Sequence, residues 1–239
     1  MKPVNIGLLG IGTVGLGTYR VLNRNQEEIQ RRAGRNIRIS MVADIDVERA
    51  RSLVSAECIV VNDGRQVIAN PDIDIVVELI GGYGIAYELV MAAIEAGKHV
   101  VTANKALIAM HGQELFDAAE AKGVRVVYEG SVAGGIPIIK VLREGLAANR
   151  ILWLAGIING TGNYILTEMR QGGRTFADVL AEAQALGYAE ADPAFDDEGT
   201  DVAHKLTILA SIAFGIPLQF DKIEVAFVTH CLYCPLLPS

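Results

Sequence analysis

The chain has 239 residues, of which 51% are hydrophobic, 21% charged and 6% aromatic. This composition supplies ample material for a hydrophobic core and excludes a disordered or collagen-like chain. The formal net charge is −7, and an acidic chain lacks the positive surface that nucleic acids and anionic membranes require, so we expect neither as a partner.

Short apolar runs alternate with helical patterns over the first half of the chain. The runs predict strands over Val4–Leu9, Ile37–Ala43, Cys58–Val61, Ile73–Leu79, His99–Thr102 and Arg125–Tyr128. Helices are expected over Thr13–Arg32, Val47–Ala56, Ala86–Ala96 and Gly112–Lys122. This alternation predicts an α/β fold, a Rossmann-type doubly wound parallel sheet with helices on both faces and right-handed crossovers.

The pattern changes after residue 130. We expect helices over Gly134–Leu146, Asn163–Gln171, Thr175–Ala185 and Asp201–Ala213, a strand over Ile151–Ile158 and an acidic loop over Asp192–Gly199. The sequence therefore predicts a dinucleotide-binding domain over residues 1–130 and an incomplete α+β substrate-binding domain over 131–223. A divergent tail follows over 224–239.

A glycine motif, Gly10-Ile11-Gly12-Thr13-Val14-Gly15, follows the first predicted strand and opens the first predicted helix. In G-x-G-x-x-G the first glycine permits a tight turn and the second lets the backbone approach a pyrophosphate. The third lets the helix pack closely on the strand. The motif predicts a site for NAD or NADP at the helix N-terminus. A glycine-rich turn that serves packing alone is the alternative.

An acidic residue ends the second predicted strand. Asp44 is the first candidate for accepting a hydrogen bond from the adenosine ribose, and Asp46 is the second. Because a carboxylate repels a 2′-phosphate, we predict that NAD is accepted at least as readily as NADP. A solvent-exposed aspartate without a ligand is the alternative. If NADP were preferred, the arginines clustered over 31–38 would be the expected phosphate partners.

Polar residues end the fifth predicted strand, where Thr102 and Lys105 follow an apolar run. The ligand crevice of a doubly wound sheet lies outside the carboxyl ends of its strands. We therefore expect both residues at the cofactor site, in preference to a surface lysine at the start of a loop.

Acidic residues and a lysine gather in the second half, at Glu190, Asp192, Asp196, Asp201 and Lys205. Asp201 and Lys205 are four residues apart and share one face of a predicted helix. Carboxylates there could hold an ammonium group, and the lysine could donate a proton to a developing alkoxide. A surface ion pair behind an acidic loop explains the spacing equally well.

Several blocks of the sequence resemble homoserine dehydrogenase, from residue 4 to about residue 222. The blocks are Gly7–Gly15, Glu78-Leu79-Ile80-Gly81-Gly82, Val101–Lys105, Glu129–Pro137, Gly156–Thr161, Leu186–Pro193 and Glu198–Lys205. The resemblance implies reversible, NAD(P)-dependent interconversion of L-aspartate 4-semialdehyde and L-homoserine, a step of threonine, methionine and isoleucine biosynthesis. The cofactor would carry the hydride.

The resemblance also assigns roles to residues. It implies that Lys205 donates the proton and that Lys105 lies between nicotinamide and substrate. The residues implied to bind the substrate are Gly187, through its backbone, Glu190 and Asp201. A sodium ion is implied at Glu129 and at the backbone carbonyls of Val132, Gly134 and Ile136, because a hard cation prefers oxygen. The intact family enzyme is expected to be a homodimer.

Two features depart from the family pattern. Many members that use NADP carry a basic residue before the strand-end aspartate, where this chain has Ala43. The sequence after Ile223 does not resemble the family, and its Cys231–Cys234 pair is a lone C-x-x-C. One alternative function is therefore a cofactor-binding fragment with weak or no catalysis. Another semialdehyde dehydrogenase is a third possibility, and the blocks over 190–205 argue against it.

The sequence also predicts where the protein resides. Three cysteines are too few for a disulfide scaffold, and glycines interrupt the first apolar run, Val4–Val14, which is neither a signal peptide nor a membrane span. We expect a cytoplasmic location.

Overall fold

The computed structural model describes residues 2–187 and 199–225. The chain divides into two compact units, residues 1–137 and 138–239, each of which is described by itself. Among the described residues, no helix combines the length and the apolar character needed to cross a bilayer.

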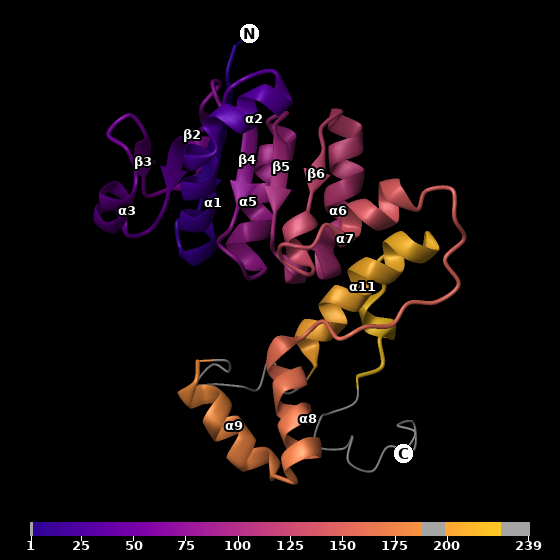
Figure 1. Cartoon of the computed structure of the whole chain (residues 1–239). Coiled ribbons are helices and arrows are strands. Elements are labelled where there is room, and N and C mark those ends of the chain that lie inside the picture. The colour runs from indigo at the N-terminus through magenta and orange to yellow at the C-terminus, as the bar shows by residue number, and fades with distance from the viewer. Residues whose placement is uncertain (1, 188–198, 226–239) are drawn as a thin grey trace. The chain divides into compact units, whose positions relative to one another are not determined.

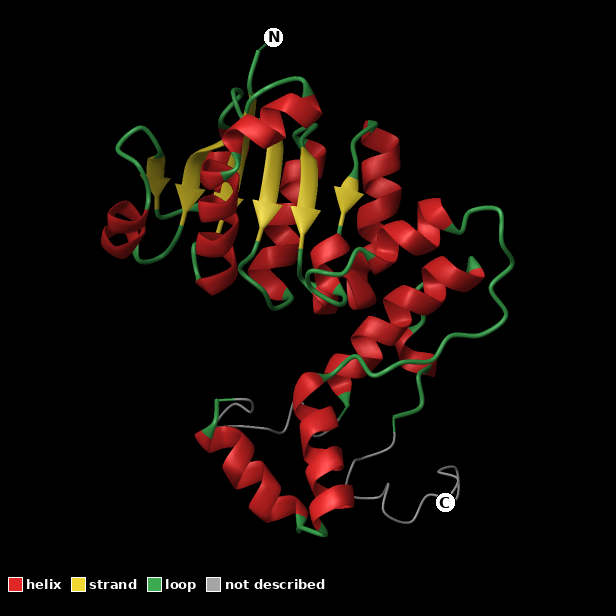
Figure 2. Ribbon diagram, viewed as in Figure 1, coloured by secondary structure: helices red, strands yellow, loops and turns green. Residues whose placement is uncertain are grey.

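The first unit contains a six-stranded parallel sheet in the order β3-β2-β1-β4-β5-β6 (Figures 1 and 2). The strands are β1 (Val4–Leu9), β2 (Ile37–Ala43), β3 (Ile59–Val61), β4 (Ile75–Glu78), β5 (His99–Thr102) and β6 (Val126–Val127). From β1 the chain builds outward to β3, then returns to add β4, β5 and β6 on the other side. This reversal confirms the predicted doubly wound α/β fold, and ligands of such sheets bind where the strand order reverses.

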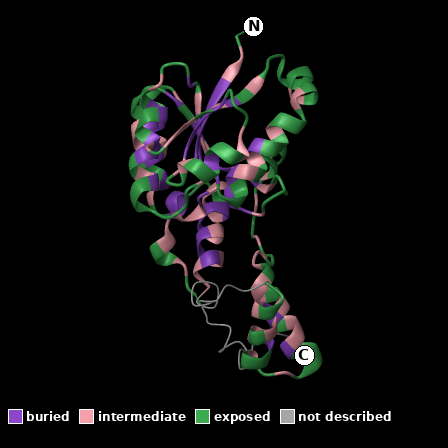
Figure 3. Cartoon of the chain, turned by 90° about the vertical axis from the view of Figure 1, so that its left-hand side faces the viewer, coloured by how far each residue is buried: buried purple, intermediate pink, exposed green. Residues whose placement is uncertain are grey.

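Helices cover both faces of this sheet (Figure 3). They are α1 (Thr13–Arg24), α2 (Gln26–Ala33), α3 (Val47–Leu53), α4 (Gly64–Ala69), α5 (Gly84–Glu95) and α6 (Lys105–Lys122). On one side the core packs Leu8, Val42 and Val77 of the sheet against Tyr19 of α1 and Ala50 of α3. The near-continuous burial of β1 is typical of a parallel strand that is covered on both faces.

Three helices differ from the prediction. The helix expected over Thr13–Arg32 is two helices, because the chain leaves helical geometry at Asn25, where φ is −106° and ψ is 22°. Helix α6 begins at Lys105 and not at Gly112, because the Asn104 side chain accepts a hydrogen bond from Leu107 N and caps the helix. Helix α4 was not predicted, since its six residues are too few to show a helical period.

The second unit is helical in its described part. It contains α7 (Ile138–Lys140), a π-helical turn (Val141–Gly145), α8 (Gly160–Gly172), α9 (Phe176–Ala185), α11 (Thr200–Phe214) and a 3₁₀ turn (Phe220–Lys222). Ile165 and Met169 of α8 pack against Val179 of α9. The helix expected from Gly134 begins only at Ile138, after the proline. Most of the expected acidic loop Asp192–Gly199 lies outside the described residues.

The strand expected over Ile151–Ile158 is wrong. These residues are irregular, and Leu152, Trp153 and Ile157 are 75%, 75% and 76% exposed. A strand needs a hydrogen-bonded neighbour, and within the described part of the second unit no strand pairs with this segment. Its apolar side chains therefore stand on the surface of this unit.

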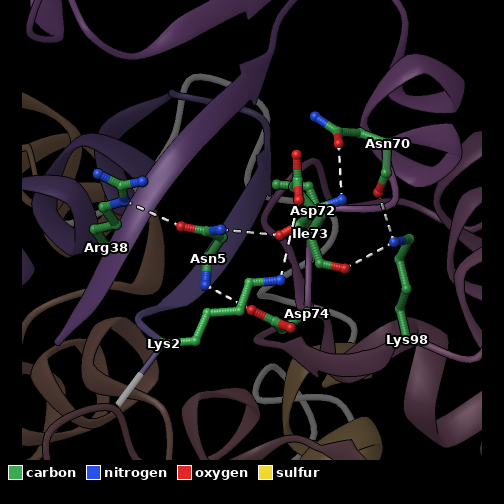
Figure 4. A network of polar contacts seen from close by, with 8 residues as sticks. All are labelled: Lys2, Asn5, Arg38, Asn70, Asp72, Ile73, Asp74 and Lys98. Atoms are coloured by element: carbon green, nitrogen blue, oxygen red, sulfur yellow. Dashed lines mark hydrogen bonds and ion pairs between the residues drawn. The ribbon is translucent and has the colours of Figure 1, made fainter. Parts of the chain in front are cut away.

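Polar side chains hold the amino edge of the sheet, opposite its carboxyl edge (Figure 4). The backbone N–H of Asn5, at the start of β1, donates to Asp74 Oδ2 at 2.8 Å, and its side-chain Nδ2 donates to the Asp72 carbonyl at 3.0 Å. Arg38 Nε donates to Asn5 Oδ1 at 3.0 Å. These bonds tie β2 and β1 to the loop that precedes β4.

A buried lysine closes the same loop. Lys98 is 7% exposed, and its ammonium donates to the carbonyls of Asn70 and Ile73 at 2.8 and 2.7 Å (Figure 4). Burial lowers the pKa of Lys98 and the charge of Asp74 opposes that shift. The lysine thus donates to two backbone acceptors of this turn, of which the Asn70 carbonyl also accepts from Ile73 N at 3.3 Å.

Candidate functional site

Four strands of the first unit end at the same level. Ala43 of β2 pairs with Leu9 of β1, Leu9 pairs with Glu78 of β4, and Glu78 pairs with Thr102 of β5. Each of these residues is the last of its strand. The glycine motif, Asp44 and Lys105 follow directly from this edge, so the structure brings the residues predicted for the cofactor to the carboxyl edge of one sheet.

The glycine loop has the tight turn and the close helix approach that the motif predicts. Gly10 has a φ of 87°, and a Cβ there would lie 3.0 Å from the Leu79 carbonyl oxygen. A Cβ on Gly15 would overlap the Gly10 carbonyl, so α1 approaches β1 closely only because residue 15 is glycine. Gly12 caps α1 without a side-chain hydrogen bond, and the space above it is open. The amides of Thr13, Val14 and Gly15 begin the helix there, as in sites for phosphate.

Asp44 braces this loop. Its Oδ2 accepts from Ile11 N at 2.8 Å and its Oδ1 accepts from Asp46 N at 3.0 Å. Asp46 is engaged differently, because its carboxylate caps α3 by accepting from Arg49 N at 3.0 Å. Asp44 also lines a cavity of about 560 Å³ together with Gly10 and Gly12. Of the two aspartates, Asp44 is therefore the one beside the glycine loop and the cavity.

An arginine that the sequence reasoning did not select lines the same cavity. Arg65 lies on α4, and its guanidinium meets Glu88 at 2.9 Å and Asp63 at 3.8 Å. The short helix that carries it was not predicted. The sequence Asn62-Asp63-Gly64 is typical of a turn. This turn is the signal that could have indicated that the chain reverses at the end of β3 and brings Arg65 there.

The arginines clustered over 31–38 lie elsewhere. Arg31 and Arg32 bind Glu28 on α2, and these bonds lower the pKa of the Glu28 carboxyl. Arg38 bonds to Asn5 at the amino edge of the sheet. None of these arginines lines the cavity beside Asp44. The arginines named as phosphate partners in the case of NADP preference thus lie away from this cavity, whereas Arg65 lines it.

A buried carboxylate links the ends of β4 and β5. Glu78 is fully buried, and its Oε1 accepts from the N–H groups of Ile80 and Gly81 at 2.8 and 3.0 Å. Its Oε2 accepts from Thr102 Oγ1 at 2.6 Å. The same hydroxyl accepts from Asn104 N at 2.9 Å, just before Lys105 begins α6.

The segment predicted to hold sodium has an alternating backbone. Ala133 and Gly135 have φ values of 50° and 86°, and they alternate with Val132, Gly134 and Ile136. Ile136 N donates to the Ala133 carbonyl at 2.8 Å, which closes a turn. The candidate ligands are backbone carbonyls of this turn and the Glu129 carboxylate. This oxygen-only donor set fits a hard cation.

The second unit holds a compact cluster of a lysine and an aspartate. Lys205 Nζ lies 2.6 Å from Asp201 Oδ2 and donates to the Ile158 carbonyl at 2.7 Å. Asn159 Nδ2 donates to the same Asp201 oxygen at 3.1 Å. The lysine and aspartate side chains are only 17% and 10% exposed, so this is no surface ion pair.

Asn159 and the carbonyl of Ile158 are members of this cluster that the sequence reasoning did not select. Asn159 Oδ1 accepts from Gly162 N at 2.6 Å and so caps α8. An asparagine before Gly-Thr-Gly is a cap signal that could have identified it. The backbone carbonyl leaves no signal in the sequence.

Two residues predicted to bind the substrate lie at or beyond the edge of the described chain. Gly187 follows α9 with a φ of 75° and donates to the Gln184 carbonyl at 3.1 Å. Glu190 lies outside the described residues.

Two sequence families match the chain. The family described as "Homoserine dehydrogenase, NAD binding domain" matches residues 10–129, and the family described as "Homoserine dehydrogenase" matches residues 137–232. Together these matches span both units.

Individual relatives agree. A homoserine dehydrogenase of Pseudomonas aeruginosa is 65% identical over 226 residues, which cover 93% of this chain and 51% of that protein. The crystal structure of a homoserine dehydrogenase from Thiobacillus denitrificans is 60% identical with a TM-score of 0.92, covering 96% of this chain and 53% of that one. A hyperthermophilic archaeal homoserine dehydrogenase in complex with NADPH is 27% identical with a TM-score of 0.78, covering 90% of this chain and 71% of that one. The chain thus spans about half the length of the curated relatives it matches.

Proposed function

The chain belongs to the homoserine dehydrogenase family, and we propose that it carries out the reaction of that family. The reaction is the NAD(P)-dependent interconversion of L-aspartate 4-semialdehyde and L-homoserine, which serves threonine, methionine and isoleucine biosynthesis. The observation that carries the proposal is the largely buried Lys205 ammonium, held by Asp201 and the Ile158 carbonyl. An ammonium fixed in this way is suited to a carbonyl oxygen that gains negative charge.

In this proposal Lys205 is the general acid. The bound cofactor supplies or accepts the hydride, so the protein has to position the reactants and deliver one proton. An ammonium has three N–H bonds. Two of those of Lys205 point at Asp201 and Ile158, and we assign the third to the substrate oxygen. Transfer of that proton as the aldehyde is reduced would yield the hydroxyl of L-homoserine.

The substrate's own ammonium group needs acceptors. We assign this role to the carboxylates of Asp201 and Glu190, with the backbone of Gly187 beside them. Asp201 would then serve two cations, its own lysine and the substrate. The buried position of its carboxylate supports this, because a carboxylate is costly to bury unless several donors bind it.

We assign residues 1–130 to the cofactor and residues 131–223 to the substrate. The amides after Gly12 would hold the pyrophosphate, and Asp44 would accept from the adenosine ribose. Lys105, the first residue of α6, would lie between nicotinamide and substrate. Asp44 favours NAD, whereas Arg65 in the same cavity provides a cation for the extra phosphate of NADP, so we propose that both cofactors bind.

Sodium and a partner subunit complete the proposal. The carbonyls of Val132, Gly134 and Ile136, with Glu129, would hold the ion and so fix the turn after β6. A homodimer in the cytoplasm stays our prediction for the intact enzyme.

A second candidate is a form that binds cofactor and turns over weakly or not at all. The exposed Leu152, Trp153 and Ile157 favour it, because an apolar segment of this kind is a surface that a catalytic domain usually covers.

Two measurements on the purified chain separate these candidates. NAD(P)H oxidation with L-aspartate 4-semialdehyde reports turnover, and titration of NAD(P)H fluorescence reports binding. Turnover that disappears in Lys205→Ala supports the enzyme, and binding without turnover supports the second candidate. A chain that does neither contradicts both.

A further inference from the structure

The carboxyl edge of the sheet has a second carboxylate besides Asp44, and this one is buried. Glu78 is the last residue of β4, fully buried, and receives three hydrogen bonds, from Ile80 N, Gly81 N and Thr102 Oγ1. All three groups donate to a carboxylate, and such charge-assisted bonds are stronger than neutral ones. Neither the proposed proton transfer nor the proposed cofactor contacts use this residue.

The bonds of Glu78 fix two loops at once. Those from Ile80 and Gly81 hold the loop after β4, which continues through Gly81 and Gly82 in left-handed conformations, with φ of 82° and 73°. The bond from Thr102 holds the end of β5. Asn104 links the two loops directly, because its Nδ2 donates to the Gly82 carbonyl at 2.7 Å.

The Thr102 hydroxyl connects Glu78 to the residue that caps α6. Its hydroxyl donates to Glu78 and accepts from Asn104 N, and the residue is 1% exposed. Asn104 in turn caps α6 by accepting from Leu107 N at 3.0 Å. The first residue of that helix is Lys105. The circuit Glu78–Thr102–Asn104 therefore sets where α6, and with it Lys105, begins.

We infer that Glu78 and Thr102 are positioning residues for the nicotinamide half of the cofactor, and that Thr102 acts through its bonds to Glu78 and Asn104 without touching the cofactor. This inference rests on the proposed dinucleotide site. In a sheet of this order the pyrophosphate lies at the ends of β1 and β4, so the ends of β4 and β5 face the other half of the molecule. The adenosine half has its own brace, Asp44. The two carboxylates thus preorganise the two halves of one site separately.

The test compares two ligands on the full chain. NADH probes both halves of the site, whereas ADP probes only the adenosine half. Thr102→Val removes the hydroxyl at nearly constant volume, and the loops it held must then be ordered by the ligand itself. We expect Thr102→Val to bind NADH about tenfold more weakly, while ADP binding stays within about twofold of the wild type. Thr102→Ser keeps the hydroxyl and should bind both ligands as the wild type does.

A variant of the carboxylate tests whether Glu78 and Thr102 act together. Glu78→Gln should weaken NADH binding in the same way, and the double variant Glu78→Gln/Thr102→Val should be no weaker than the worse single variant, because both break one circuit. An equal loss of ADP and NADH binding in Thr102→Val, or a Thr102→Ser variant as weak as Thr102→Val, would overturn the inference. So would unchanged NADH binding in Thr102→Val. Failure of the wild type to bind any dinucleotide would instead overturn the proposed cofactor site.

Discussion

Asp201 and Lys205 lie one helical turn apart on α11, and their side chains meet at 2.6 Å in a position largely withdrawn from solvent. Pairs at this spacing on an exposed helix are worth only tenths of a kcal/mol. Here the burial and the bonds from Asn159 and to Ile158 make the pair a fixed unit that orients the ammonium.

Lys205→Ala should lower the turnover of L-aspartate 4-semialdehyde by about 10²-fold or more, since the variant loses its general acid. Turnover is measured as NAD(P)H oxidation by the purified chain, and NAD(P)H binding should stay near the wild-type value because the lysine belongs to the second unit. Lys122→Ala, on the exposed end of α6, is the control. A fully active Lys205→Ala variant would transfer the role to Lys105 or to water.

Cofactor choice should depend on Asp44 and Arg65. The wild type should bind NADH at least as tightly as NADPH, and Arg65→Ala should weaken NADPH by about tenfold with little effect on NADH, because only NADPH carries the 2′-phosphate. The measurement is a fluorescence titration of both cofactors. Arg38→Ala, at the opposite edge, is the matched control. Strong preference of the wild type for NADPH would refute the role of Asp44, and equal losses for both cofactors in Arg65→Ala would refute that of Arg65.

Lys98→Met should lower the free energy of unfolding of the chain by about 1–3 kcal/mol, because the Ile73 carbonyl loses its ammonium donor in a buried position and the Asn70 carbonyl keeps only the bond from Ile73 N at 3.3 Å. Urea denaturation measures the change, and Lys122→Met, at an exposed position, should stay within about 0.5 kcal/mol of the wild type.

The same lysine predicts a pH dependence. Burial lowers the pKa of Lys98 below its ordinary 10.5. Between the folded and unfolded pKa values the unfolded chain therefore binds more protons, so stability rises with pH in that window. The stability of the wild type relative to Lys98→Met should accordingly increase as the pH approaches 10.5 and be constant below the folded pKa. A difference that falls with pH would contradict the assignment.

The exposed segment 151–158 should drive association of the second unit with another copy of itself. Trp153 is the single tryptophan of the chain, so its fluorescence reports this segment alone. We expect its emission to shift to shorter wavelength as protein concentration rises, and Leu152→Ser to weaken the shift. Sedimentation that shows a monomer at every concentration would exclude such association.

Much of the first unit follows from the sequence, because each parallel strand is a short apolar run between two helical segments, and such runs are visible in the sequence. Six strands and the carboxyl edge where Gly10, Asp44 and Lys105 meet were predicted. Arg65 and Asn104 were not, since their places depend on short or capped helices whose start is decided by one side-chain bond.

The second unit was harder to predict for a different reason. The apolar run 151–158 has the composition of a strand, but a strand also needs a partner, and composition cannot show whether one is present. The pairing of Asp201 with Lys205 did follow from their spacing. Its burial, which distinguishes a site from a surface pair, comes from Asn159 and Ile158, more than forty residues away.

Asn159 bonds both to the Asp201–Lys205 pair and to the first turn of α8. The hydrogen bonds of the pair therefore depend on whether that turn is closed or frayed. The oxygen of its side-chain amide accepts from Gly162 N in the first turn of α8, while the nitrogen of the same amide donates to Asp201. When that turn opens, the aspartate loses a donor in the same event. The exchange rate of the Gly162 amide hydrogen in heavy water is therefore a gauge of the site, readable by NMR without substrate or cofactor, and ligands that clamp Asp201 should slow it.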